Sequence, residues 1–204
     1  MDNWITNLIK KKSDLTLNNL ILPGTHNSAC HKLNLDCGYN FPIISHVIQN
    51  WTLNQNLTVY EQLVNGVRML DIDISYIDNK FYTSHTFIID ELENLFEQLK
   101  KYNEECGDIY IIKFICRDNI NNENISELAN IINNIFKNKI ILPQNYPNVL
   151  NTPLSTFINS QQNMIIYMDY QNHPFYNTKI HLYSSWTNDS DITNSFVNNN
   201  IVLN

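Results

Sequence analysis

Short apolar segments alternate with amphipathic helical patterns along most of this chain, and that order constrains the fold more than any other feature. Residues 109–116 (IYIIKFIC) are almost continuously apolar, which is typical of a parallel strand buried on both faces. Similar runs lie at residues 67–74 and 164–168, and helical patterns at residues 88–102 and 125–136 separate the runs. Strands alternating with helices predict an α/β fold with a parallel sheet.

The length of the chain limits how complete a barrel can be. The sequence has 204 residues, whereas a TIM-type barrel of eight β/α units usually needs roughly 250. No GxGxxG or P-loop fingerprint is present, which argues against the nucleotide-binding α/β folds. We therefore expect a single domain over residues 1–204, folded as a distorted or incomplete TIM-type (β/α) barrel.

Shorter segments complete the predicted element order. Residues 3–12 predict a short helix, which either caps the bottom of the barrel or touches a membrane surface. Three prolines between residues 140 and 153 indicate a loop. The remaining elements are helices at residues 59–65 and 154–159, strands at residues 18–23 and 80–87, and weak strands at residues 181–184 and 201–203.

Chemically active side chains gather at the ends of three successive predicted strands. The first strand leads into His26 and Asn27, the second ends with Asp71 and Asp73, and the third ends with His85. In α/β barrels the active site lies at the carboxyl ends of the strands. The same residues could also be solvated strand ends, but their grouping predicts one site.

Strand alternation adds a constraint on the two aspartates. Because successive side chains point to opposite faces, Asp71 and Asp73 share one face, and Leu70 and Ile72 share the other with Arg68. Two unpaired carboxylates at a barrel mouth would be costly through burial and repulsion, so the pair requires a cation or hydrogen-bond donors. Arg68 lies on the helix-facing side and is expected to pair with a helix carboxylate.

The charge and the termini exclude several classes of partner. A net charge of −7 argues against nucleic acid and against electrostatic adsorption to anionic membranes. The first residues lack the apolar core of a signal peptide, and no stretch is apolar enough to span a bilayer. The spacing of the cysteines matches no zinc pattern. These features predict a cytoplasmic monomer with reduced thiols.

Three segments in order resemble a known family. LPGTHNS (residues 22–28), EQLVNGVRMLDIDI (residues 61–74) and SHT (residues 84–86) resemble the X domain of phosphatidylinositol-specific phospholipases C, which have the fold of the phospholipase C-like phosphodiesterases. Weaker similarity continues through residues 108–116 and 154–170 and covers most of the chain. The combination of PGTH, GVRMLDI and a histidine on the next strand is fairly specific.

The resemblance implies phosphodiester cleavage by general acid–base catalysis. The residue matching His26 acts as the base on the inositol 2-hydroxyl, which attacks phosphorus, and the residue matching His85 protonates the departing diacylglycerol oxygen. Imidazole can do both near neutral pH. The implied substrate is a phospholipid or a soluble phosphodiester, with transient contact to a membrane surface for the lipid.

The chain differs from the family pattern at positions that determine which cation neutralises the substrate phosphate. Metal-independent bacterial members carry Asp where Asn27 stands and Arg where Asp73 stands, and that Arg is the cation for the phosphate. Calcium-dependent eukaryotic members have His-Asn at the first position and Glu-x-Asp at the second, which is closer to this chain. The resemblance therefore implies one divalent cation, calcium or magnesium, bound by Asn27, Asp71 and Asp73.

Two further positions leave alternatives open. The fourth calcium ligand of the family falls near Ile115, which is flanked on its face by Lys113 and Arg117, so Lys113 could neutralise the aspartates without a metal. Bacterial relatives place an inositol-binding Arg after the strand that matches residues 164–168, where this chain has Asp169. Lys113 and Asp169 are thus the predicted substrate-binding residues, and the head group stays undefined.

Other functions remain compatible with the sequence. Glycerophosphodiester phosphodiesterases and sphingomyelinase-D-like enzymes also combine two histidines with an acidic-x-acidic pair. A catalytically weak binding module that keeps the X-domain shell is an alternative from another class, favoured by the missing fourth ligand. The retained His26 and His85 favour an enzyme.

Overall fold

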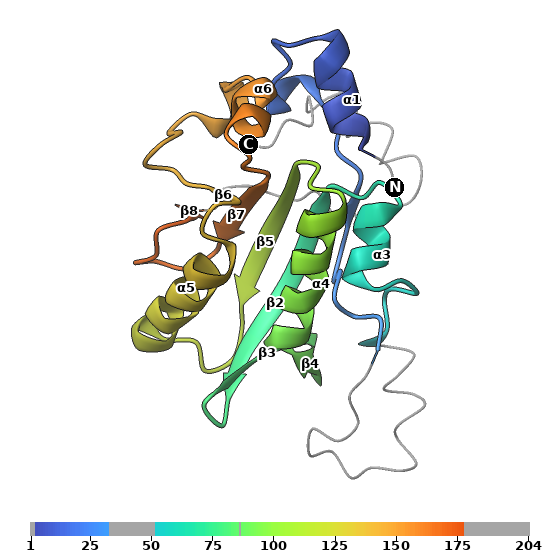
Figure 1. The fold of residues 1–204 in the computed structure, drawn as a ribbon. Coiled ribbons are helices and arrows are strands. Elements are labelled where there is room, and N and C mark those ends of the chain that lie inside the picture. The colour runs from blue at the N-terminus through green and yellow to red at the C-terminus, as the bar shows by residue number, and fades with distance from the viewer. Residues whose placement is uncertain (1–2, 33–51, 86, 178–204) are drawn as a thin grey trace, which may run out of the picture.

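A single mixed sheet organises the part of the chain that the computed structural model describes, residues 3–32, 52–85 and 87–177. Within these ranges the strands follow the order β4-β3-β2-β5-β7-β6, with β1 added beside β2 and β8 beside β7 (Figure 1). The predicted strands at residues 181–184 and 201–203 lie outside the described residues. The strands are β1 (Gly24–Thr25), β2 (Met69–Ile77), β3 (Lys80–His85), β4 (Phe87–Glu91), β5 (Tyr110–Cys116), β6 (Ile140–Ile141), β7 (Met164–Met168) and β8 (Tyr176–Asn177).

Helices separate most of these strands, as the sequence pattern predicted. Five α-helices and two short 3₁₀ helices lie in the described ranges. They are α1 (Trp4–Lys11), η1 (Leu17–Asn19), α3 (Val59–Val64), α4 (Leu92–Glu105), α5 (Asn122–Phe136), η2 (Val149–Asn151) and α6 (Leu154–Asn159).

The sheet is mostly parallel but does not close. β1, β2, β5, β7, β6 and β8 pair in parallel, whereas β2–β3 and β3–β4 are antiparallel. Within the described residues no pairing joins the outer strands β4 and β6. The prediction of an α/β fold with a distorted, incomplete barrel is confirmed, while the predicted parallel pairing does not extend to β3 and β4.

A tight turn explains why the third strand is antiparallel. Asp78 and Asn79 connect β2 to β3 with φ values of 50° and 62°. A two-residue connection with both φ values positive is the type I′ hairpin turn, which Asp and Asn tolerate. The hairpin folds β3 back along β2, so Ser84 pairs with Asp73. The end of β3 therefore lies beside the middle of β2.

The alternation of β2 separates a helix-covered face from a second face. Leu70, Ile72 and Ile74 are buried in a core with side chains of α3, α4 and α5, and α4 and α5 cover this face in Figure 1. Met69 belongs to a second core on the other face, together with Ile111 and residues of α1 and α6. Asp71 and Asp73 share the face of Met69, as the parity argument predicted.

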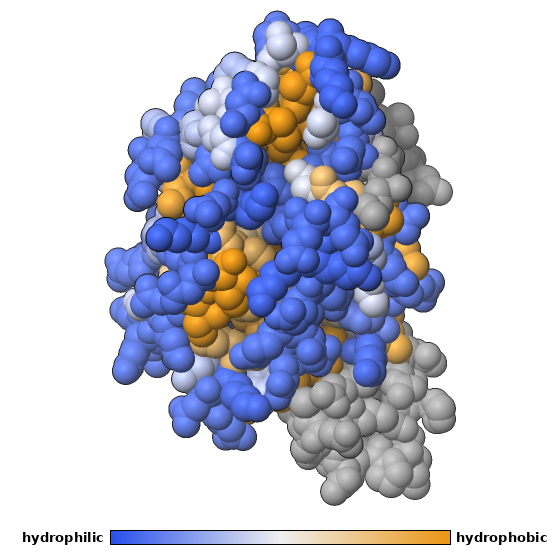
Figure 2. Space-filling model, in the orientation of Figure 1, coloured by the Kyte–Doolittle hydropathy of each residue, from blue (hydrophilic) through white to orange (hydrophobic). Residues whose placement is uncertain are grey.

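The helices present polar surfaces to solvent. In Figure 2 the outer surface over α4 is mainly hydrophilic, and apolar side chains show between α4 and α5. This is the expected appearance of amphipathic helices whose apolar sides face a sheet. No helix in the described ranges is both long and apolar enough to span a bilayer.

A buried ion pair anchors the amino ends of β2 and β5. Arg68 and Asp108 are fully buried, and Arg68 Nη2 lies 3.0 Å from Asp108 Oδ2. The Asp108 carboxylate also accepts hydrogen bonds from the backbone N–H groups of Ile5 and Thr6, at the start of α1. Helix α1 therefore caps this end of the sheet, with Ile5 and Ile9 buried. The expected partner of Arg68 is corrected: it is a loop carboxylate, not a helical one.

Three element assignments differ from prediction. Residues 18–23 do not form a strand, and the chain there has η1 followed by an extended segment into the two-residue β1. Strand β4 spans residues 87–91, although the sequence predicted a helix from residue 88, because a short apolar run suits either state. The predicted loop at residues 140–153 contains β6 and η2.

Candidate active site

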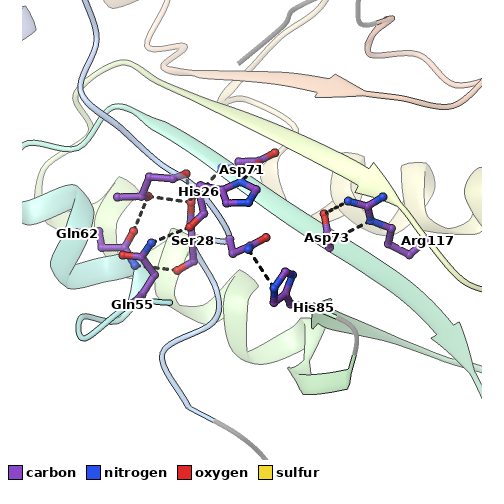
Figure 3. Close-up of polar contacts among 10 residues, drawn as sticks. His26, Ser28, Gln55, Gln62, Asp71, Asp73, His85 and Arg117 are labelled. Carbon is purple, nitrogen blue, oxygen red and sulfur yellow. Dashed lines mark hydrogen bonds and ion pairs between the residues drawn. The ribbon is translucent and has the colours of Figure 1, made fainter. Parts of the chain in front are cut away.

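His26 is positioned by the short strand that precedes it. Strand β1 pairs in parallel with β2, with Thr25 opposite Leu70, which brings His26 beside Asp71. His26 Nδ1 lies 2.6 Å from Asp71 Oδ2, and the Asp71 side chain is only 5% exposed (Figure 3). A carboxylate at this distance accepts the Nδ1 proton and so assigns the lone pair of the neutral ring to Nε2. This is the tautomer that a general base at this position would require.

A hydrogen-bonded turn fixes the backbone around His26. Ser28 N donates to the Asp71 carbonyl, and Asp71 N donates to Ser28 Oγ, which ties the turn to β2 on both sides. Gln62 of α3 donates to the Ser28 carbonyl, and Gln55 donates to the His26 carbonyl, each at 2.7 Å (Figure 3). Sequence analysis missed these residues, because side-chain to backbone contacts across long separations leave no periodic signal.

His85 reaches the same site from the end of β3. The β3–β4 register shifts between Thr83 and Ser84. Asn27 Nδ2 lies 3.4 Å from His85 Nε2, a weak contact that joins the residue after His26 to the second histidine. Asn27 is buried and has a φ of 49°, a conformation that asparagine tolerates better than most residues. The two predicted histidines are thus brought together around Asn27.

Burial makes His85 a more acidic group than an ordinary histidine. Desolvation lowers the pKa of His85 from its usual value of 6.5, and the charges of His26 and Arg117 lower it further, while Asp73 opposes the shift. A lowered pKa makes the protonated ring a stronger acid, but the ring then carries its proton mainly on the acidic side of neutrality.

Asp73 has a cation of its own. Arg117, the residue after β5, donates from Nε to Asp73 Oδ2 at 2.8 Å and from Nη2 to Oδ1 at 3.2 Å (Figure 3). The Asp73 side chain is 5% exposed and that of Arg117 is 51% exposed. Burial raises the pKa of Asp73, and the Arg117 guanidinium opposes that rise. Sequence analysis placed Arg117 on this face but did not assign it as the partner.

Asp73, His85 and Arg117 border a cavity, whereas His26, Asn27 and Asp71 are not among its lining residues. The cavity has a volume of about 320 Å³, at the small end of the range for ligand sites. It extends from the middle of β2 to the ends of β3 and β5. Its lining residues are Asp73, Ser75, Ile77, Ser84, His85, Phe87, Ile88, Arg117 and Asp118.

The two predicted substrate residues have different surroundings. Lys113 of β5 is half-buried and lies opposite Asp71 in the strand register. Among the ion pairs of the described residues, those of Asp71 and Asp73 involve His26 and Arg117 rather than Lys113. Asp169 is exposed and accepts a hydrogen bond from the backbone N–H of Cys116 at 2.6 Å, which ties the end of β7 to β5. Substrate binding by Lys113 and Asp169 stays a prediction.

Metal binding by Asn27, Asp71 and Asp73 stays a prediction. Of the four carboxylate oxygens in that set, three have partners within the described residues and Asp71 Oδ1 is buried without one. Calcium takes six to eight oxygen ligands, but both Asp73 oxygens are bonded to Arg117 and one Asp71 oxygen is bonded to His26. Within the described residues no group of three or more His, Cys, Asp or Glu side chains could hold a metal ion. The positive charge next to Asp73 comes from the chain itself.

Sequence comparison finds relatives that are named for a PI-PLC X domain. No protein-family model matches the chain. A PI-PLC X-box domain-containing protein of Dictyostelium discoideum is 30% identical over 117 residues, which is 53% of this chain and 16% of that protein. A PI-PLC X domain-containing protein of the same organism is 23% identical over 108 residues, 49% of this chain and 19% of that protein. The match thus spans less than a fifth of either relative.

Structure comparison finds bacterial enzymes with the same fold. The phosphatidylinositol-specific phospholipase C of Listeria monocytogenes has a TM-score of 0.53 and 19% identity, covering 81% of this chain and 57% of that enzyme. A variant of the Staphylococcus aureus enzyme has a TM-score of 0.59 and 16% identity, covering 79% of this chain and 51% of that enzyme.

Fold and sequence therefore agree on one class of protein. The fold is similar to the distorted barrel of the bacterial phosphatidylinositol-specific phospholipases C, with an open sheet. In sequence the chain is similar to PI-PLC X-domain proteins, which confirms the resemblance seen in its PGTH and GVRMLDI segments.

Proposed function

We propose that this chain is a phosphodiesterase of the phospholipase C type, which cleaves phosphatidylinositol or a related phosphodiester with His26 as general base and His85 as general acid. The observation that carries the proposal is the pairing of a carboxylate-oriented histidine with a second, partly buried histidine across Asn27. Two imidazoles of this kind suit a reaction in which one proton is removed and another is delivered. The similarity to X-domain proteins supports the same reaction class.

The proposed reaction uses the two histidines in turn. His26 Nε2 takes the proton of a substrate hydroxyl, and the hydroxyl oxygen forms a new bond to phosphorus. The bond from phosphorus to the leaving oxygen breaks, and protonated His85 gives that oxygen its proton. With a neighbouring hydroxyl as nucleophile the product is a cyclic phosphate, which water can open by the reverse use of the two histidines.

Asp71 acts through His26, and its replacement tests that role. Asp71→Asn removes the charge that holds the Nδ1 proton, so kcat should fall on the order of a hundredfold, in the range that general base catalysis contributes. The KM should change little, because Asp71 is buried beside His26 and away from the cavity lining. Asp78→Asn makes the same chemical change in the exposed β2–β3 turn and should leave kcat unaltered. Equal kcat values for the two variants would show that Asp71 does not orient the base.

The pH dependence of cleavage should report on His85. As a general acid His85 must be protonated, so kcat/KM should fall as pH rises through its pKa. Because burial lowers the pKa of His85 below 6.5, that decline should occur on the acidic side of neutrality. Initial rates on a soluble phosphodiester from about pH 4.5 to 8.5 measure the profile. An alkaline limb that begins well above neutrality would contradict the assigned role.

A substrate panel separates this function from its alternatives. Phosphatidylinositol, a glycerophosphodiester and sphingomyelin are offered in parallel to the same preparation. We expect cleavage of phosphatidylinositol. Preference for either of the other two would favour the glycerophosphodiester phosphodiesterase or sphingomyelinase-D-like alternative, and cleavage of none would favour the binding module.

Transient contact with a lipid surface is part of the proposal. Leu53 and Leu57 are exposed on either side of Gln55, which is bonded to the His26 carbonyl, and they suit such contact.

A further inference from the structure

The Asp73–Arg117 pair leaves one edge of the Arg117 guanidinium open. Asp73 is bonded to the edge formed by Nε and Nη2. Arginine carries five N–H donors in a planar fork, so the edge formed by Nη1 and Nη2 is not used by this carboxylate. The Arg117 side chain is half exposed while Asp73 is buried beneath it. Asp73 therefore holds the guanidinium by one edge and presents the other.

Arg117 and His85 both line the cavity described above. A phosphate that reaches Arg117 from this cavity therefore also lies near the proposed acid. A guanidinium edge matches two oxygens of a phosphate, and such charge-assisted pairs are stronger than neutral hydrogen bonds. The cavity is thus lined both by a guanidinium that suits phosphate, that of Arg117, and by the proposed proton donor His85.

Other charges that face the cavity allow an anion to bind there. Asp73 neutralises one unit of positive charge, but it is bonded to the edge formed by Nε and Nη2 and leaves Nη1 and the second N–H of Nη2 to another acceptor. Asp118 also lines the cavity, and its exposed position means that solvent screens its charge. Protonated His85 adds positive charge in the form of the protein that is active as a general acid. The paired hydroxyls of Ser75 and Ser84 complete the polar lining.

We propose that Arg117, held by Asp73, is the phosphate-binding cation of this site and that it takes the place of a divalent metal ion. This inference rests on the proposed function for the identity of the phosphate as that of a phosphodiester substrate. Charge that builds on the phosphoryl oxygens during the reaction is stabilised by a fixed cation. Arg117 is the residue after β5. Asp73 of β2, which stands where the metal-independent relatives carry their phosphate-binding Arg, holds Arg117 in place.

Calorimetric titration with inorganic phosphate and with inositol 1-phosphate tests the site without relying on turnover. Arg117→Met should weaken the binding of both probes at least about tenfold, because it removes a bidentate charge-assisted contact. Arg117→Lys keeps the charge but loses the fork, so its affinity should lie between those of Arg117→Met and the unaltered protein. Lys80→Met, which removes an exposed charge paired with Glu91, is the matched control and should bind as the unaltered protein does.

A second variant guards against loss of the fold. Arg117→Met alone leaves Asp73 buried without its partner, so the double variant Asp73→Asn/Arg117→Met removes both charges and should fold while still failing to bind phosphate. In the unaltered protein, titration with calcium chloride should release no heat, and cleavage should be the same in EDTA and in calcium.

The outcomes separate this inference from the proposed function. Phosphate binding that depends on Arg117 in a protein that cleaves none of the substrates would support the inference while refuting the proposed function. Active protein whose phosphate affinity survives Arg117→Met, or whose cleavage disappears in EDTA and returns with calcium, would overturn the inference and leave the proposed function standing.

Discussion

Replacing His26 or His85 with alanine should lower the rate of phosphodiester cleavage by at least about a hundredfold, because each variant removes a proton transfer from the reaction. The two losses should not add in the double variant, since the base and the acid act in one transition state. His31→Ala is the matched control, because the His31 ring contacts the Ala29 carbonyl and is not part of the site. Steady-state rates on phosphatidylinositol vesicles measure the effect, with circular dichroism to verify folding.

This prediction also separates an enzyme from a binding module. A module that keeps only the X-domain shell would bind lipid about as well after either replacement, and its residual cleavage would not depend on the histidines. Rates within about threefold of the unaltered protein for both variants would contradict acid–base roles for His26 and His85.

Asp108→Ala should lower the free energy of unfolding by about 3–5 kcal/mol, the cost of removing one partner from a buried ion pair. The change leaves the fully buried Arg68 without the carboxylate that lies 3.0 Å from its Nη2. It also removes the acceptor for the N–H groups of Ile5 and Thr6, so the start of α1 loses its cap. Urea denaturation followed by tryptophan fluorescence measures the loss.

Two further variants test whether the lost stability comes from the buried ion pair. Glu97→Ala breaks the exposed pair with Lys100 and should not shift the urea midpoint measurably. The double variant Arg68→Met/Asp108→Leu should lose less stability than the two single changes combined, because it leaves no unpaired buried charge. A midpoint for Asp108→Ala equal to that of Glu97→Ala would show that the buried pair does not hold the amino ends of β2 and β5.

The local parts of the site were predictable from the sequence. Strand alternation has a period of two, so the shared face of Asp71 and Asp73 followed from their spacing alone. The strands β2, β5 and β7 were recognised because their sequences are nearly continuous apolar runs, typical of strands buried on both faces. His26 and His85 followed from their position after predicted strands and from the family resemblance.

The partners of the aspartates could not be predicted, because they depend on strand pairing. Arg117 meets Asp73 only through the parallel register of β5 against β2, which a crossover through α4 sets. His26 meets Asp71 through a two-residue strand that propensity does not detect. The Asp78–Asn79 turn did carry a signal for the antiparallel hairpin, since a two-residue Asp-Asn connection suits the type I′ turn. That turn brings the end of β3 to the site.

Phosphorus NMR of phosphatidylinositol vesicles treated with the protein tests the central claim most directly, because it observes the phosphodiester itself. The account predicts that the lipid signal is replaced by that of a cyclic inositol phosphate with the unaltered protein, in EDTA, and that this conversion fails with His26→Ala and with His85→Ala. An unchanged lipid signal with the unaltered protein, or equal conversion by the histidine variants, would contradict it.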